Sequence, residues 1–139
     1  MMMQQFTRFI LALLSSVALF ISYSCQPAAS TEVGSPQDTQ ILNTTVTVDT
    51  TYISGAQLYA RGIVTNNSTS TISPPWYVEC QFYTDSTFTL KMGGSNTLIS
   101  APLSPGQGTF WTISYSSTNV DVRNYPKFRV KDQRAIYKR

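Results

Sequence analysis

Side chains suited to catalysis are few in this chain, and histidine is missing altogether. The chain therefore lacks the residue that most often serves as a general base near neutral pH and as a zinc ligand. Neither a Ser-His-Asp triad nor a Cys-His pair can form. The two cysteines are Cys25 and Cys80. Because Cys80 stands in an alternating apolar stretch, residues 76–83, we expect it to be a buried small hydrophobe, and we predict no catalytic residue.

The acidic residues are also poorly placed for chemistry, because they are scattered among polar and turn segments. Catalysis by paired carboxylates needs two acids side by side in a cleft. Asp85, followed by Ser86, is typical of a turn rather than of a metal ligand. No segment resembles a calcium-binding EF-hand loop, and the Gly93-Gly94 pair lacks the Lys-Ser or Lys-Thr of a phosphate-binding loop. The sequence thus predicts neither a metal nor a cofactor.

The first 25 residues are typical of a secretory signal peptide. Arg8 precedes an apolar run of 13 residues, 9–21, which is followed by Ser22, the bulky Tyr23, Ser24 and Cys25. A membrane-spanning helix needs about 20 apolar residues, so this run is short for one. Cleavage near Ala28 or Ala29 remains an alternative, and it would discard Cys25 and release a soluble periplasmic protein.

Residues 22–25, Ser-Tyr-Ser-Cys, resemble the lipobox of bacterial lipoproteins, in the relaxed form common among Bacteroidetes. Ser22 stands where Leu, Val or Ile is usual. The resemblance implies that residues 1–24 are removed and that Cys25 is acylated, becoming the mature N-terminus. We therefore expect a lipid anchor in the cell envelope, with the outer membrane favoured and its periplasmic or surface face left open.

The mature chain divides into a polar tether and one domain. Residues 25–40 include Pro27, Gly34 and Pro36 and have almost nothing to bury, which predicts a flexible tether. From residue 41 to 139 the chain consists of short runs rich in Thr, Val, Tyr and Phe, separated by turn residues. This pattern predicts an all-β fold with antiparallel strands, since no crossover helix is present.

Six or seven strands in about 100 residues predict an immunoglobulin-like β-sandwich. Residues 76–83 alternate most clearly, with Trp76, Val78, Cys80 and Phe82 on one face. In the first strand we expect Val46, Val48, Thr50 and Tyr52 to share a face. Gly93 to Asn96 is expected to close a hairpin. The predicted strands cover residues 44–53, 57–65, 76–83, 87–92, 97–100, 108–115 and 127–130, the last extending to 136 or 137.

Three segments together resemble the FxLYD type of bacterial domain. They are residues 62–66 (Gly-Ile-Val-Thr-Asn), 78–85 (Val-Glu-Cys-Gln-Phe-Tyr-Thr-Asp) and 103–106 (Leu-Ser-Pro-Gly), the last followed by Phe110. The departures are Cys80 in place of the usual Phe, Phe82 in place of Leu, and Thr84 inserted before Asp85. The resemblance implies a small immunoglobulin-like sandwich in a secreted or lipid-anchored protein.

Two surface features are candidates for binding. The segment 121–139 carries seven basic residues and two acidic ones, whereas residues 25–120 carry two basic and five acidic ones. Lys127, Arg129 and Lys131 alternate with apolar residues, so we expect them on one face near a sandwich edge. They would protect that edge or contact an anionic lipid or polysaccharide. The total charge of +3 is too small to indicate nucleic acid binding.

Aromatic side chains are the second feature. We expect Tyr59, Tyr77, Tyr83 and Tyr115 to face away from the core, and one of Phe110 and Trp111 to point outward. Aromatic patches on a rigid sandwich can bind a glycan or another protein.

The sequence therefore favours a non-enzymatic, lipid-anchored envelope protein whose sandwich binds or scaffolds other envelope proteins or glycans. A soluble periplasmic carrier or accessory protein and a small secreted enzyme are the alternatives.

Overall fold

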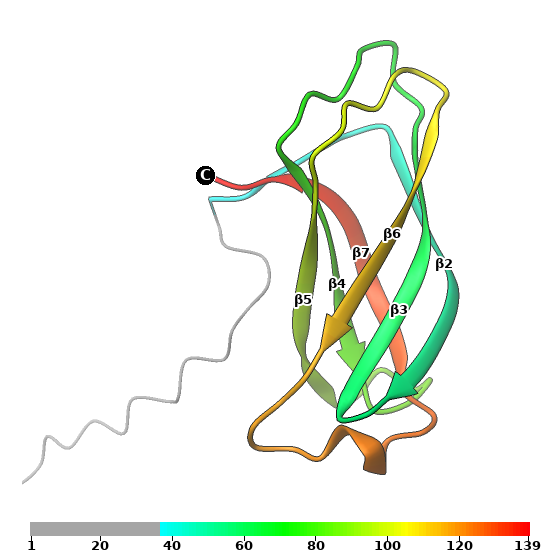
Figure 1. Ribbon diagram of the computed structural model, residues 1–139, viewed down its shortest axis with the longest axis vertical. Helices are drawn as coiled ribbons and strands as arrows, with labels where there is room; N and C mark the ends of the chain where they lie inside the picture. The colour runs from blue at the N-terminus through cyan, green and yellow to red at the C-terminus, as the bar shows by residue number, and fades with distance from the viewer. Residues whose placement is uncertain (1–36) are drawn as a thin grey trace, which may run out of the picture.

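The computed structural model describes residues 37–139, which form two antiparallel β-sheets packed face to face (Figure 1). One sheet has the strand order β1-β7-β4-β5 and the other β2-β3-β6. The predicted fold class, an antiparallel immunoglobulin-like β-sandwich of six or seven strands, is confirmed. The elements are β1 (Thr39–Gln40), β2 (Thr44–Ser54), β3 (Gln57–Asn66), β4 (Trp76–Tyr83), β5 (Lys91–Ile99), β6 (Gly108–Tyr115), the short 3-10 helix η1 (Val122–Asn124) and β7 (Arg129–Tyr137).

The domain begins two residues earlier than the predicted boundary at residue 41. Thr39 and Gln40 form β1 and pair with Tyr137 and Ile136 of β7. The Ile41 backbone N–H adds a hydrogen bond to the carbonyl of Ala135, with an N···O distance of 2.9 Å. Backbone hydrogen bonds hold Thr39 and Gln40 in the sheet, so no apolar pattern in the sequence marks them as a strand. Residues 25–36 of the predicted tether, with Cys25, lie outside the described residues.

The predicted hairpin between residues 87–92 and 97–100 is wrong, because one continuous strand, β5, spans Lys91–Ile99. Gly93 and Gly94 pair with Phe82 and Gln81 of β4 instead of forming a turn. A Cβ atom on Gly93 would lie 2.6 Å from a ring carbon of Tyr115. The Tyr115 hydroxyl donates a hydrogen bond to the Met92 carbonyl at 2.6 Å. Gly93 therefore marks a close approach between the two sheets.

The prediction of which β2 side chains share a face is correct for the first half of the strand only. Val46 and Val48 pack against the core, but a bulge at Asp49 shifts the register against β3. The extra residue reverses the alternation, since side chains in a strand point to opposite faces in turn. As a result Ile53 packs inward, whereas Tyr52 stacks on Tyr59 with ring centroids 5.0 Å apart.

The core lies between the sheets and contains the inward face of β4, as predicted. The buried residues Trp76, Val78, Cys80 and Phe82 belong to it. Trp111 is buried and Phe110 is exposed, so the expected division of this pair is confirmed. The outward placement predicted for Tyr115 is wrong, because its ring stacks on Phe82 with centroids 5.2 Å apart.

Asn66 and the turn at Pro105 and Gly106 shape one end of the sandwich, as their residue types predict. The buried Asn66 side chain donates to the carbonyls of Ser70 and Leu103, at 2.8 Å each. Its carbonyl oxygen accepts from the Ser68 backbone N–H at 3.0 Å. Gly106 has a φ of 74°, as the third residue of a type II turn requires. Asn66 therefore ties β3 to the neighbouring loops.

Burial controls the chemistry of Cys80. Desolvation, followed by the nearby charge of Glu79, raises the pKa of the Cys80 thiol to about 12 from 9.0. The thiol pKa is higher in the folded state than in the unfolded state. The neutral thiol therefore contributes fully to stability at pH values below the pKa of the unfolded state. That contribution is lost as the pH rises from 9.0 to about 12.

We therefore expect the free energy of unfolding to fall between about pH 8 and about pH 10.5, with about 2 kcal/mol of the loss due to Cys80. In Cys80→Ala this part of the loss should disappear. Chemical denaturation of both proteins at the two pH values measures the difference. An equal loss in both proteins, or rapid modification of native Cys80 by a thiol reagent near pH 8, would contradict the burial argument.

Candidate functional site

The outward face of β4 carries polar side chains that are far more buried than an outer sheet face requires. Glu79 is 1% exposed and Gln81 is 8% exposed, although both point away from the core. Carboxylates are almost never fully buried unless they are paired, because removing a charge from water is costly. These two positions therefore mark the polar site that the sequence reasoning missed.

Glu79 is paired with Arg134 of β7 through one carboxylate oxygen only. The Arg134 Nε–H donates a hydrogen bond to Glu79 Oε1, and the two residues face each other in the β4–β7 register. Glu79 Oε2 is buried and has no hydrogen-bond partner among residues 37–139. A buried acceptor left without a partner costs roughly 1–3 kcal/mol. The site thus contains a buried acceptor that no described residue uses.

A bulge in β7 brings Arg134 to this face. Glu79 pairs with Arg134 and Gln81 pairs with Lys131, so two residues of β7 stand opposite Cys80. Asp132, one of these two, has a φ of 56°, which is uncommon for a residue other than glycine. Without the extra residue, alternation from Lys131 would place Arg134 on the inward face. Bulges often re-aim side chains next to functional sites.

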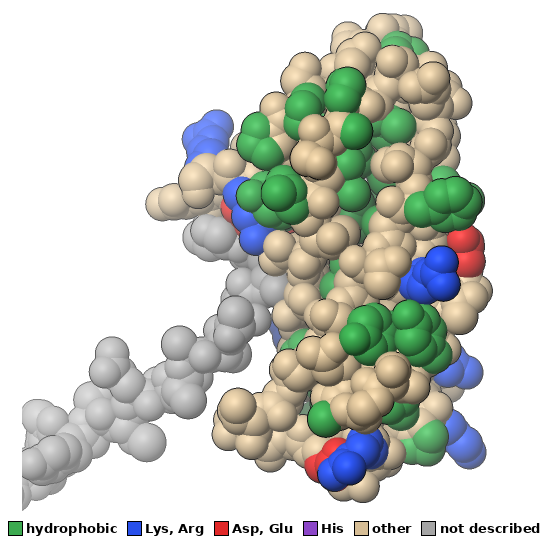
Figure 2. Space-filling view, in the orientation of Figure 1, with side chains coloured by type: hydrophobic (Ala, Val, Ile, Leu, Met, Phe, Trp, Pro, Cys, Tyr) green, Lys and Arg blue, Asp and Glu red, His purple; other side chains and the backbone are tan. Residues whose placement is uncertain are grey.

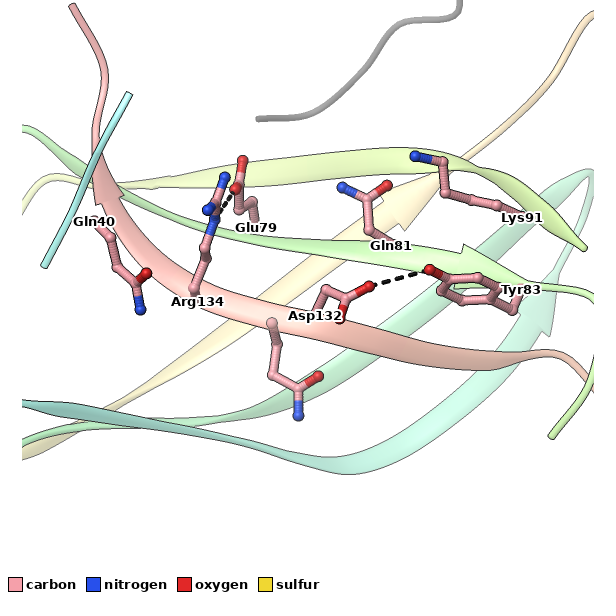
Figure 3. Close-up of a pocket in the computed structure, with 8 residues that line it drawn as sticks. Gln40, Glu79, Gln81, Tyr83, Lys91, Asp132 and Arg134 are labelled. Carbon is pink, nitrogen blue, oxygen red and sulfur yellow. Dashed lines mark hydrogen bonds and ion pairs between the residues drawn. The ribbon is translucent and has the colours of Figure 1, made fainter. Parts of the chain in front are cut away.

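These residues line a groove of about 470 Å³ on the outer face of the four-stranded sheet, here called the outer groove (Figure 3). Its size falls within the range of small-molecule binding sites. The groove is open to solvent and draws on three of the strands and on the residue at the end of β1. It is lined by Gln40, Glu79, Gln81, Tyr83, Lys91, Asp132, Gln133 and Arg134.

A second polar contact fixes the other end of the outer groove. The Tyr83 hydroxyl donates to Asp132 Oδ2 at 3.0 Å, as the dashed line in Figure 3 marks. Partial desolvation, then this hydrogen bond and the charge of Asp132, raise the pKa of Tyr83. Tyr83 therefore stays protonated as a donor at neutral pH. Phe88 packs edge-on against the Tyr83 ring, with centroids 5.4 Å apart.

The arrangement is better suited to binding than to bond cleavage. Arg134 fixes the Glu79 carboxylate, and Tyr83 fixes that of Asp132, so both acids already have partners for one oxygen. Within residues 37–139 no three of the Asp, Glu and Cys side chains gather closely enough to hold a metal ion. The outer groove can donate and accept hydrogen bonds along an exposed sheet face.

The basic residues predicted as a surface site lie beside the outer groove, not in it. Lys127, Arg129 and Lys131 are exposed, and the last two pair with Tyr83 and Gln81 in β4. The Lys131 ammonium lies 5.2 Å from the centre of the Phe88 ring. Among residues 37–139, β1 pairs only with Ile136 and Tyr137 of β7, so Arg129 and Lys131 lie in a part of β7 that has no strand partner on that side.

We expect the triple change of Lys127, Arg129 and Lys131 to Gln to reduce binding of the chain to anionic liposomes if these residues contact charged surfaces. The effect should shrink as salt rises, because exposed charges are screened over about 8 Å at physiological ionic strength. Liposome flotation at low and high salt measures it. Equal flotation with neutral and anionic liposomes, before and after the change, would leave only edge protection for these residues.

Comparison with known proteins adds no relative: no family model, no curated protein and no solved structure matches the chain. The resemblance to FxLYD domains therefore stays a prediction. In residues 37–139 no helix has the length and apolar character that crossing a bilayer requires.

Proposed function

We propose that this protein is a non-enzymatic, lipid-anchored binding module of the cell envelope and that the outer groove is its contact site. The observation that carries this proposal is the buried Glu79 carboxylate: Glu79 lines the groove, and its buried Oε2 has no hydrogen-bond partner among the described residues. Such an acceptor is costly to the isolated domain. A ligand that donates a hydrogen bond to it recovers that cost, which makes the groove a binding site.

The alternatives fit the molecule less well. A carrier that encloses its cargo needs an internal cavity, but large buried side chains such as Trp76, Trp111 and Phe82 lie between the sheets. An enzyme needs a free acid, base or nucleophile at the site. Glu79 is held by Arg134, and the thiol of Cys80 is buried on the inner face of the same strand.

The position of the proposed anchor supports the same assignment. Gln40 of β1 lines the outer groove, and only 13 residues lie between Cys25 and Thr39 along the chain. A flexible chain of that length has a root-mean-square span of about 20 Å. An acylated Cys25 would therefore keep the groove close to the membrane and to other envelope components.

Retention of envelope components by the immobilised chain tests this function. Native protein and Asp49→Asn, a control change at an exposed position of the other sheet, should retain at least one component from a detergent-solubilised envelope fraction. Glu79→Gln should lose that component. If all three proteins retain the same components in equal amounts, the outer groove is not the contact site.

A further inference from the structure

We propose that the outer groove binds a neutral, hydroxyl-rich oligosaccharide; this inference rests on the proposed function and names its ligand class. The group that meets Glu79 Oε2 must be a hydrogen-bond donor, because a carboxylate oxygen only accepts. A hydroxyl, an amide N–H and an ammonium all qualify on that ground. The charges around the groove distinguish among these three kinds of donor.

The outer groove is already balanced in charge. It contains the acids Glu79 and Asp132 and the bases Lys91 and Arg134, so its formal charge is zero. The Arg134 guanidinium compensates the Glu79 carboxylate directly. An ammonium ligand would add an uncompensated positive charge beside Arg134, and like charges disfavour each other at close range. A neutral donor can reach Glu79 Oε2 without that penalty.

The rest of the lining favours hydroxyls over amides. Gln40 and Gln133 each carry an amide that both donates and accepts hydrogen bonds. Lys91 adds a donor at the exposed rim. A sugar hydroxyl likewise donates once and accepts twice, so adjacent hydroxyls can satisfy an acceptor such as Glu79 Oε2 and a neighbouring donor together. A peptide amide donates from its N–H and accepts at its C=O, which point in opposite directions, whereas a hydroxyl does both at one atom.

Shape supports a chain-like ligand. The groove of about 470 Å³ extends along the outer sheet face from Gln40 to Tyr83 (Figure 3). The half-buried Tyr83 ring adds an apolar surface next to its hydroxyl. An oligosaccharide can lie across such a surface with part of its length in solvent. By contrast, the face built from β2, β3 and β6 presents separated apolar groups (Figure 2).

The test is binding of the full chain, purified in detergent, to an array of neutral oligosaccharides of hexoses, 6-deoxyhexoses and N-acetylhexosamines. A sulfated polysaccharide and an oligolysine peptide provide charged comparisons. We expect at least one neutral oligosaccharide to bind. Glu79→Gln should weaken that binding about tenfold or more, since it replaces an acceptor to a bound hydroxyl by an amide.

A second pair of variants keeps the test informative if Glu79→Gln folds poorly. Lys91 lies at the rim of the outer groove, and Arg61 is exposed on the other sheet. Lys91→Gln should weaken binding of the neutral oligosaccharide, whereas Arg61→Gln, also a basic residue changed to Gln, should not.

Binding to the sulfated polymer or the oligolysine alone would overturn the assignment of a neutral ligand, as would binding to nothing on the array. Equal binding by Lys91→Gln and Arg61→Gln would overturn its placement in the groove. If Glu79→Gln loses an envelope component while no neutral oligosaccharide binds, the groove keeps its proposed role and only the ligand class fails.

Discussion

Gly62→Ala is expected to destabilise the domain by about 3 kcal/mol, a large share of the stability of a small domain. Gly62 lies in β3 opposite the bulge of β2, where the two backbones approach closely. A Cβ atom at this position would lie 1.8 Å from the carbonyl oxygen of Thr47 and 2.9 Å from the ring of Trp111. Neither neighbour can move easily, because one is backbone and the other is a buried ring.

Gly55→Ala is the matched control for this change. Gly55 has a φ of 59°, but nothing lies within 4 Å of a Cβ added there. Only backbone strain of about 1–2 kcal/mol is expected. Denaturant unfolding of the three proteins should give free energies of unfolding that decrease in the order native, Gly55→Ala, Gly62→Ala. A Gly62→Ala protein as stable as Gly55→Ala would contradict the close approach between β2 and β3.

Cys25→Ala is expected to move the protein from the membrane fraction to the soluble fraction almost completely. Stable anchoring by lipid chains depends on their covalent attachment, and the lipobox resemblance places that attachment at Cys25. The domain should remain folded, since its strands begin at Thr39. Fractionation after a high-salt wash, combined with circular dichroism of the soluble form, measures both effects.

Cys80→Ala is the control for Cys25→Ala, because it removes the other cysteine without touching the proposed anchor. It should stay with the membrane. If Cys25→Ala still sediments with membranes after the wash, the anchor is not at Cys25.

The fold could be predicted from the sequence wherever alternation was undisturbed. Trp76 to Tyr83 alternates without a break, and its predicted bounds match β4. Prediction failed where the pattern depends on contacts distant in sequence. Gly93 indicates a turn locally, yet it accommodates the Tyr115 ring from the other sheet. The bulge at Asp49 likewise depends on pairing with β3, and it reverses which side chains point inward in the second half of β2.

The candidate site was harder to predict than the fold. Glu79 lies at an outward position of β4, and such positions normally face water. Its burial depends on Arg134, 55 residues later, and on the bulge that turns Arg134 outward. No local pattern reveals that pairing. A glutamate between Val78 and Cys80 in the most apolar strand was the available signal.

Nuclear magnetic resonance of the isotope-labelled chain, titrated with solubilised envelope polysaccharide and protein, tests the central claim most directly. The side-chain N–H groups of Gln81 and Arg134 report on the outer groove. We predict that the largest shift changes occur at these groups and at the backbone of Glu79. Changes confined to the opposite sheet, around Phe110 and Tyr59, with the outer groove unaffected, would contradict the claim that the outer groove is the binding site.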